Sequence, residues 1–309
     1  MNLKGRSLLT LKDYSKDEIL FLLDLADTLK KEKLNGVYKK RMQNKNVALI
    51  FEKPSTRTRC AFTVACADEG AHPEFLGVSD IQLGHKESVA DTARVLGRMF
   101  DIIEFRGFSQ KTCEDLAKYS KVPVINGLTD DDHPTQALAD LMTIREQKGA
   151  LSGIKVVFAG DGRNNVANAL MIACCKVGIN FVIASPQALF PDKTLYELCK
   201  AYAKESGGSV NLESDIEKAV LGADVIYTDV WVSMGEEAKS AERMEMLKPY
   251  QVNENIMSIA GEDAIFLHCL PAVKGNEVTE GVFESSRSFV FDEAENRMHT
   301  IKAVMVAVI

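Results

Sequence analysis

Short apolar segments alternate with amphipathic segments along the chain, and this alternation predicts an α/β fold. Residues 47–51 are a typical apolar segment, since five strand-forming residues are followed by a Glu-Lys-Pro stop. Residues 15–33 show the amphipathic pattern, because Ser15 and Glu18 are spaced as a capping box before leucines at helical intervals. Strands are predicted at residues 47–51, 73–78, 101–105, 122–126, 154–159, 180–184, 224–228, 264–267 and 289–291, with helices between most of them.

The alternation falls into two blocks, which predict two Rossmann-like domains, each a parallel β-sheet flanked by helices. With 309 residues the chain is long enough for two domains of ordinary size. The first domain is placed at residues 1–147 and the second at residues 148–292. Open parallel sheets bind ligands at the carboxyl ends of their strands, so the active site is expected in a cleft between the two domains.

The richest cluster of chemical groups follows the first strand, at residues 55–59, which read Ser-Thr-Arg-Thr-Arg. An apolar helix comes next, so Ser55 or Thr56 is the expected N-cap. Unpaired backbone N–H groups, three hydroxyls and the guanidiniums of Arg57 and Arg59 would meet at this helix start, a combination suited to phosphate. The alternative is an ordinary capped helix with two surface arginines, and the cluster alone leaves both interpretations open.

Two further side chains are expected at the same edge of the first sheet. Arg106 ends the strand at 101–105, where open α/β sheets bind ligands. His133 lies just before Pro134, which is favourable at the start of a helix. A lone histidine before a proline is usually a turn residue, but the strand-end arginine and the cluster at 55–59 favour a functional role.

The second block begins with a strand, a turn and a helix, which in outline could form a dinucleotide site. The turn at residues 160–165 reads Gly-Asp-Gly-Arg-Asn-Asn, so Asn165 replaces the third glycine of the fingerprint. The next strand, 180–184, is not followed by the acidic residue that would bind a ribose. A nicotinamide oxidoreductase is therefore disfavoured, and neither an organic cofactor nor a metal is expected.

Composition excludes several classes of function. The formal net charge of −7 offers no basic surface for nucleic acid. The seven cysteines are scattered without a CxxC pair, which favours reduced thiols in the cytoplasm. The sequence shows no secretory signal and no apolar run long enough to span a bilayer. A soluble cytoplasmic protein is therefore expected.

Four motifs together resemble the aspartate/ornithine carbamoyltransferase family, and they occur in that family's order. The motifs are Ser55-Thr56-Arg57-Thr58-Arg59, His133-Pro134-Thr135-Gln136, Asp229 with Ser233-Met234-Gly235, and His268-Cys269-Leu270-Pro271. The resemblance covers essentially the whole chain, and the last two motifs point to the ornithine branch.

The resemblance implies transfer of the carbamoyl group from carbamoyl phosphate to the δ-amine of L-ornithine, giving citrulline and phosphate in arginine biosynthesis and metabolism. It implies carbamoyl phosphate ligands at Ser55, Thr56, Arg57, Thr58, Gln82, Arg106, His133, Gln136, Cys269, Leu270 and Arg297. The implied catalytic residues are Thr58, Arg106 and His133, which would form an oxyanion site, and Cys269, beside the reacting amine. The implied ornithine ligands are Asn165, Asp229, Ser233 and Met234.

The resemblance also implies a homotrimer and leaves a larger assembly open. The loop of Gln82 would reach the active site of a neighbouring subunit, and the helix at 293–309 would pack back on the first domain. The residues alone favour simpler interpretations: a surface loop for Gln82, a small buried side chain for Cys269, and a surface charge for Arg297.

Alternatives on the same scaffold make different predictions. An enzyme that uses aspartate would be expected to carry a proline and a basic residue where this chain has residues 269–271. A putrescine enzyme would lack the element at 233–235, since its acceptor has no α-carboxylate. A catalytically silent subunit predicts loss of Arg57, Arg106 or His133, and all three are present. These alternatives are disfavoured.

Overall fold

The computed structural model describes residues 1–83, 86–232 and 240–309, and it divides into two compact units. Unit 1 comprises Met1–Ala139 and Glu295–Ile309, and unit 2 comprises Asp140–Ala294. Each unit holds one parallel sheet flanked by helices, so the predicted class of two parallel-sheet α/β domains is confirmed. The boundaries predicted from the sequence and the cleft between the domains stay predictions. None of the described helices is long and apolar enough to cross a membrane.

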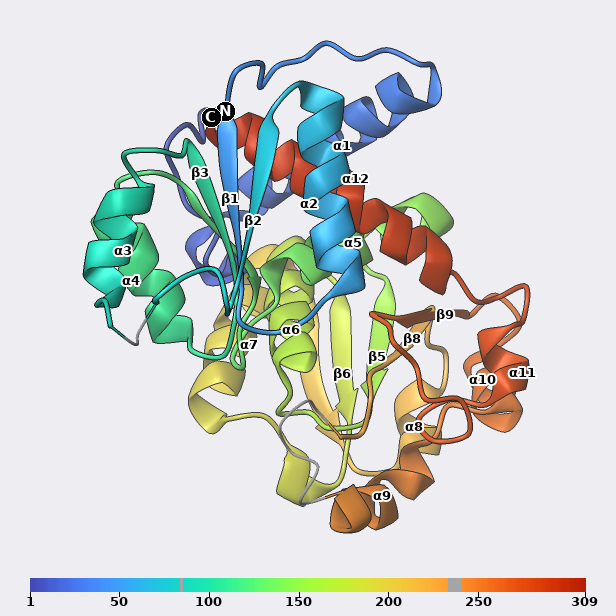
Figure 1. Ribbon diagram of the computed structural model, residues 1–309. Helices are drawn as coiled ribbons and strands as arrows, with labels where there is room; N and C mark the ends of the chain where they lie inside the picture. The colour runs from blue at the N-terminus through green and yellow to red at the C-terminus, as the bar shows by residue number, and fades with distance from the viewer. Residues whose placement is uncertain (84–85, 233–239) are drawn as a thin grey trace. The chain divides into compact units, whose positions relative to one another are not determined.

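Unit 1 is built on a four-stranded sheet with the order β2-β1-β3-β4 (Figure 1). Its strands are β1 (Asn46–Phe51), β2 (His72–Gly77), β3 (Ile102–Arg106) and β4 (Val124–Leu128). Its helices are η1 (Leu11–Asp13), α1 (Lys16–Leu34), α2 (Thr56–Glu69), α3 (Val89–Leu96) and α4 (Gln110–Ser120), with parts of α5 (Pro134–Lys148) and α12 (Val290–Val308). Helices α3 and α4 cover one face of the sheet and share a core with β1, β3 and β4.

The N-terminal and C-terminal segments of the chain meet in unit 1. The backbone N–H of Gly5 donates to the carbonyl of Val308 over 2.7 Å. Further along α12, the buried ammonium of Lys302 forms an ion pair with Asp68 of α2. These contacts hold the C-terminal part of α12 within unit 1, which places Arg297 near the residues of α2.

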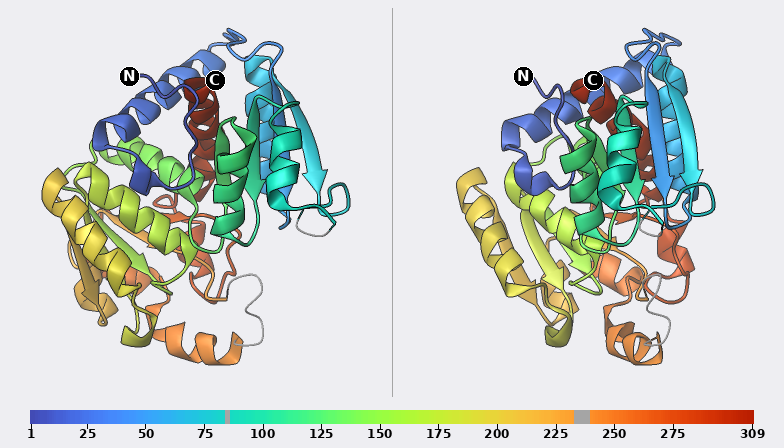
Figure 2. Two further views of the ribbon diagram at one scale, coloured as in Figure 1. Left: turned by 90° about the vertical axis from the view of Figure 1, so that its left-hand side faces the viewer. Right: turned by 60° about the vertical axis from the view of Figure 1, so that its left-hand side comes forward.

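Unit 2 contains a five-stranded parallel sheet with the order β7-β6-β5-β8-β9. Its strands are β5 (Lys155–Ala159), β6 (Asn180–Ala184), β7 (Ser209–Glu213), β8 (Val225–Thr228) and β9 (Ile265–His268). Its helices are α6 (Asn165–Val177), η2 (Gln187–Leu189), α7 (Lys193–Ser206), α8 (Ile216–Val220), α9 (Ser240–Leu247), η4 (Lys248–Tyr250), α10 (Glu254–Ala260) and α11 (Glu280–Phe283). Helices α6 and α7 pack against each other, and Figure 2 shows them in yellow-green and yellow.

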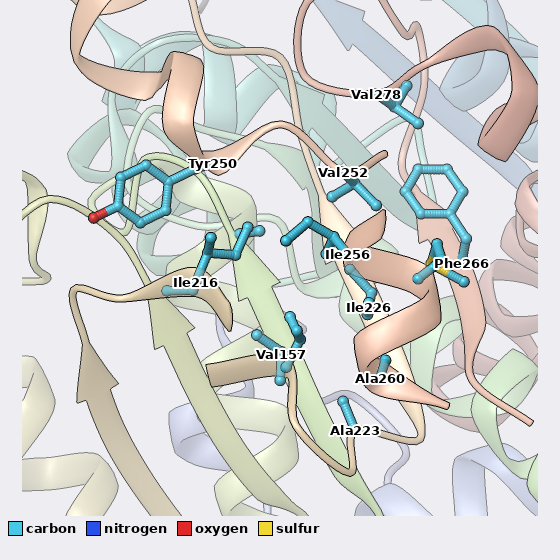
Figure 3. Packing of buried hydrophobic residues seen from close by; sticks show 14 of the residues in the cluster. Val157, Ile216, Ala223, Ile226, Tyr250, Val252, Ile256, Ala260, Phe266 and Val278 are labelled. Carbon is cyan, nitrogen blue, oxygen red and sulfur yellow. The ribbon is translucent and has the colours of Figure 1, made fainter. Parts of the chain in front are cut away.

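The core of unit 2 lies between its sheet and the short helices that follow β7. Val157 of β5, Ile226 of β8 and Phe266 of β9 point into it, and Ile216 and Ile256 meet them from α8 and α10 (Figure 3). All five are apolar side chains of which less than a tenth is exposed, so their removal from water is a main source of this unit's stability. This core fixes the strand ends that carry the second set of predicted site residues.

Two local predictions differ from the structure. Residues 289–291 do not form a strand, because α12 already begins at Val290 and Phe291 is 65% exposed. Acidic residues follow immediately, and they favour the positive end of a helix over a continued strand. The strand β7 was not predicted, since its residues Ser209–Glu213 are mostly polar and only partly buried at the edge of the sheet.

Candidate functional site

The first cluster of predicted site residues lies at the carboxyl edge of the sheet in unit 1. Arg106 is the last residue of β3 and pairs in register with Phe51 of β1, and the chain continues from β1 into α2. Ser55 is the N-cap of α2, and its hydroxyl accepts the backbone N–H of Thr58 over 3.1 Å. The predicted helix start is thus confirmed, and it brings Thr58 to the end of β3.

The Thr58 hydroxyl accepts hydrogen bonds from two guanidiniums. Arg297 Nη2 donates to it over 3.0 Å and Arg106 Nη1 over 3.4 Å. A hydroxyl has two acceptor positions and one proton, so this geometry directs the proton of Thr58 toward a further acceptor. Thr58 is only 1% exposed, and hydrogen bonds from charged donors are strong in such surroundings.

Arg297 organises the rest of this cluster. Its Nη1 donates to Gln136 Oε1 over 2.5 Å and lies 3.4 Å from His133 Nε2. Its Nη2 also reaches the Thr135 hydroxyl over 3.4 Å. One guanidinium therefore binds side chains from α2, from the start of α5 and from the turn before it, all within unit 1.

The His133 ring is neutral in this arrangement. Burial lowers its pKa well below the ordinary value, and Arg297, Arg106 and Arg57 add to this effect. Because a guanidinium has only donors, Nε2 must accept from Arg297, and Nδ1 then carries the proton and faces Thr135 over 3.4 Å. Nε2 could donate a hydrogen bond to a substrate oxygen only after the contact with Arg297 is broken and the ring proton moves from Nδ1 to Nε2.

A buried carboxyl lies next to these cations. Glu104 of β3 is fully buried, and neither of its oxygens has a hydrogen-bond partner among the described residues. Burial raises its pKa well above the ordinary value, although Arg106 and Arg297 act in the opposite direction. A neutral Glu104 leaves the positive charge of the cluster uncancelled, which favours an anionic ligand.

The remaining residues of the first predicted set are more peripheral. Thr56 is exposed at the first position of α2, and Arg57 is half-buried and acts on His133. Arg59 points elsewhere, because its guanidinium lies 3.6 Å from the centre of the Phe75 ring. Gln82 is exposed next to the undescribed residues 84–85, so its predicted role at a neighbouring subunit stays a prediction.

The second cluster lies at the carboxyl edge of the sheet in unit 2, where Ala159, Thr228 and His268 pair in register across neighbouring strands. Asp229 and Cys269 follow two of these strand ends. The Cys269 thiol donates to Asp229 Oδ1 over 3.0 Å, and Asp229 is only 8% exposed. Burial raises the pKa of the Asp229 carboxyl.

Asn164 holds the other oxygen of Asp229. Its Nδ2 donates to Asp229 Oδ2 over 3.2 Å, while its own oxygen caps α6 by accepting the Ala167 N–H over 2.6 Å. The sequence prediction named Asn165, which is half-buried at the first position of α6. The N-cap pattern of an asparagine before a helix could have identified Asn164.

Ligand atoms of Asp229, His268 and Cys269 lie within 4.8 Å of one another, a spacing that could suit a metal ion. The histidine nitrogens are already engaged, however: Nδ1 accepts the Leu270 N–H over 2.9 Å, and Nε2 lies 3.2 Å from Glu277 Oε1. These contacts favour a hydrogen-bonded turn at residues 268–271 rather than an open coordination site.

The predicted residues thus fall into two sets. Thr58, Arg106, His133, Gln136 and Arg297 are brought together in unit 1, and Asp229 and Cys269 in unit 2. Leu270 belongs to unit 2 and has a positive φ of 59°. Ser233 and Met234 lie outside the described residues. Thr135 contacts the unit 1 cluster and was not predicted, although it lies inside the motif at 133–136.

Family models match both halves of the chain. Residues 6–146 match the carbamoyl-P binding domain of aspartate/ornithine carbamoyltransferase, and residues 152–308 match its Asp/Orn binding domain. The chain belongs to the aspartate/ornithine carbamoyltransferase family. The family resemblance seen in the sequence motifs is therefore confirmed over nearly all 309 residues.

Relatives within this carbamoyltransferase family are similar over their full length. The catabolic ornithine carbamoyltransferase of Bacillus licheniformis is 59% identical over 325 residues, covering 99% of this chain and 97% of that protein. The ornithine carbamoyltransferase of Caldanaerobacter subterraneus is 61% identical, covering 99% and 98%. The solved ornithine carbamoyltransferase of Pyrococcus furiosus is 50% identical with a TM-score of 0.97, covering 100% of this chain and 98% of that chain.

Proposed function

We propose that this carbamoyltransferase moves the carbamoyl group from carbamoyl phosphate to the δ-amine of L-ornithine, forming citrulline and phosphate. Full-length relatives at about 60% identity that carry the name ornithine carbamoyltransferase support this activity. The observation that carries the proposal is the Thr58 hydroxyl, which accepts from both Arg106 and Arg297 at the start of α2. This arrangement suits a doubly charged donor substrate with a polarisable carbonyl.

Unit 1 binds carbamoyl phosphate. The backbone N–H groups at the start of α2, Ser55 and Arg57 hold the phosphate, and Arg106 spans the phosphate and the carbonyl oxygen. Thr58 donates its proton to that oxygen, because its two acceptor positions are occupied by guanidiniums. Gln136 and His133 hold the carbamoyl group.

Unit 2 binds ornithine. The Asp229 carboxylate accepts the α-ammonium, and the ammonium's charge offsets the cost of burying this acid. Asn165, Ser233 and Met234 bind the α-carboxylate, and Cys269 lies beside the δ-amine.

The reaction needs a neutral amine and a polarised carbonyl. The δ-amine attacks the carbonyl carbon, and negative charge develops on the carbonyl oxygen. The carbon–oxygen bond to phosphate then breaks, and the departing phosphate accepts the proton that the attacking nitrogen loses. Thr58 and Arg106 stabilise this charge, and each such donor is typically worth about 10²–10³ in rate. Holding the two reactants together contributes roughly 7–11 kcal/mol more.

We also propose that the enzyme is a cytoplasmic homotrimer in which Gln82 serves a neighbouring site. Each of the seven cysteines is a free thiol, which suits a reducing compartment. A hollow of about 320 Å³ beside the Gln82 loop is lined by five apolar residues and Glu52, and Val78 and Phe108 there are 58% and 50% exposed. Light scattering tests the assembly: we expect three times the chain mass of 34.0 kDa, and a monomeric mass would contradict it.

A citrulline assay tests the activity. The purified enzyme is given carbamoyl phosphate with L-ornithine, L-aspartate or putrescine in parallel, and citrulline from ornithine alone is expected. Turnover of aspartate or putrescine instead would be consistent with carbamoyl phosphate binding in unit 1 but would contradict L-ornithine as the acceptor. Folded protein that turns over none of the three amines would contradict the proposed function.

A further inference from the structure

A set of fully buried polar side chains in unit 2 contacts the turn that carries Cys269. It consists of Glu293 of α12, Asp140 of α5 and Tyr227 of β8. The Tyr227 hydroxyl donates to Glu293 Oε1 over 3.1 Å and lies 3.4 Å from Asp140 Oδ1. The carboxyls of Glu293 and Asp140 thus meet at the same hydroxyl.

Tyr227 has only one hydroxyl proton, so both contacts can be hydrogen bonds only if one carboxyl of the pair carries a proton. Burial raises the pKa of Glu293, and Asp140 raises it further. Asp229 and Cys269, at the predicted ornithine side, add to the raised pKa of Tyr227, which burial mainly causes. A pair that keeps one proton adds one negative charge to this region, whereas two separate carboxylates would add two.

Glu293 also holds the backbone of the turn. Its Oε2 accepts the His268 N–H over 2.9 Å. The His268 ring then fixes the next residues, since its Nδ1 accepts the N–H of Leu270 over 2.9 Å. Leu270 has a φ of +59°, which leucine rarely adopts, so its surroundings must hold it in place.

We propose that Glu293 is a positioning residue for ornithine: with the proton that it shares with Asp140, it holds the His268 N–H and so orients Cys269 and Asp229. The inference rests on the proposed binding of ornithine in unit 2. Glu293 itself comes from outside the turn, 25 residues along the chain from His268. Burying two acids costs solvation that apolar residues of the same volume would not lose, so a functional role accounts for their presence better than stability does.

Two variants of the intact enzyme test the proposal, with Asp292→Asn as the control. Glu293→Gln keeps an acceptor for the His268 N–H and a polar group beside Tyr227, but it has no proton to lose. Glu293→Ala removes the acceptor and leaves the His268 N–H unsatisfied. Asp292 is the exposed neighbour on the same helix, so its amide variant changes charge without touching the turn.

The readouts are the KM for ornithine and the KM for carbamoyl phosphate. We expect Glu293→Ala to raise the KM for ornithine by about tenfold or more, since small displacements of binding groups have large effects. The KM for carbamoyl phosphate should stay within about twofold, and Glu293→Gln and Asp292→Asn should resemble the wild type at neutral pH. At alkaline pH the wild type should lose affinity for ornithine relative to Glu293→Gln, because only the wild type can lose the shared proton.

Other outcomes would overturn the proposal. Equal changes in both KM values would indicate a general structural role, and an unchanged KM for ornithine in Glu293→Ala would exclude positioning. If Glu293→Ala does not fold, the KM for ornithine of the wild type is compared with that of Glu293→Gln across pH. A ratio of these two KM values that stays constant would contradict the shared proton. A wild type that forms no citrulline from ornithine would instead contradict the proposed function, which separates the two failures.

Discussion

The polar clusters of the two units hold protons in opposite ways. In unit 1, burial and three arginines lower the pKa of His133, so the histidine stays neutral among cations. In unit 2, burial raises the pKa of Asp229, and burial together with Asp140 raises the pKa of Glu293. One unit thus concentrates positive charge, and the other concentrates acidic groups whose pKa is raised.

This difference indicates which substrate group each cluster fits. Guanidiniums gathered at the start of α2 repel one another until an anion arrives, and a buried acid such as Asp229 is costly until a cation pairs with it. Glu104 is an exception in unit 1, yet its raised pKa keeps it from neutralising Arg106 and Arg297. A phosphate and an ammonium therefore suit different units of the same chain.

The largest expected effect tests the cationic cluster. Arg106→Ala removes one of the two guanidiniums on Thr58, and we expect activity to fall by about 10²–10³ or more, as for loss of an oxyanion donor. Steady-state citrulline assays at saturating ornithine measure it. The matched control is Arg59→Ala. Arg59 lies on the same helix as Thr58, but its guanidinium stacks on Phe75 instead of contacting the Thr58 hydroxyl. Comparable losses in both variants would show that general positive charge, rather than this cluster, supports activity.

A smaller effect is expected in the acidic cluster. Asp229→Asn keeps the shape of the side chain and removes its charge. Loss of a charged hydrogen bond to the α-ammonium costs about 1.5–3 kcal/mol, so we expect the KM for ornithine to rise roughly 10- to 150-fold. The KM for carbamoyl phosphate should change little. The control is Asp263→Asn, at an exposed position of the same unit. An equal rise in both KM values would contradict the division of substrates between units.

The sequence predicted these clusters unevenly, for physical reasons. Buried strands and capped helices are local patterns, so β1, the N-cap Ser55 and the capping box of α1 could be predicted. A strand end identified Arg106, and the family resemblance identified Thr58 and Arg297. Neither showed that Thr58 accepts from both arginines, because the contact with Arg297 joins residues 239 positions apart.

Partners of buried acids were the least predictable part. Glu104 lies in an apolar strand and Glu293 in the first turn of α12, where an acidic residue is ordinary. Their roles depend on what the fold packs against them, which no local pattern states. The apolar run at 289–291 was misassigned for a different reason: the acids directly after it favour the start of a helix, a local signal that the strand prediction did not use.

The smallest expected effect concerns stability and tests whether His133 stays neutral in the folded protein. Its pKa is lowered in the folded state, so below about pH 6.5 the unfolded chain binds a proton that the folded chain does not. Stability contributed by this residue is therefore present above pH 6.5 and lost as the pH falls. Between pH 7.5 and 5.5 the free energy of unfolding should fall by about 1.4 kcal/mol more in the wild type than in His133→Gln.

Urea unfolding at the two pH values measures this difference, and only the change with pH in each protein is compared. His72→Gln is the control, since the His72 side chain is 69% exposed and belongs to neither cluster. An equal fall in the free energy of unfolding between pH 7.5 and 5.5 in wild type and His133→Gln would mean that His133 takes up its proton in the folded protein. The guanidiniums would then fail to keep the ring neutral, and the contrast between the two units would rest on the acids of unit 2 alone.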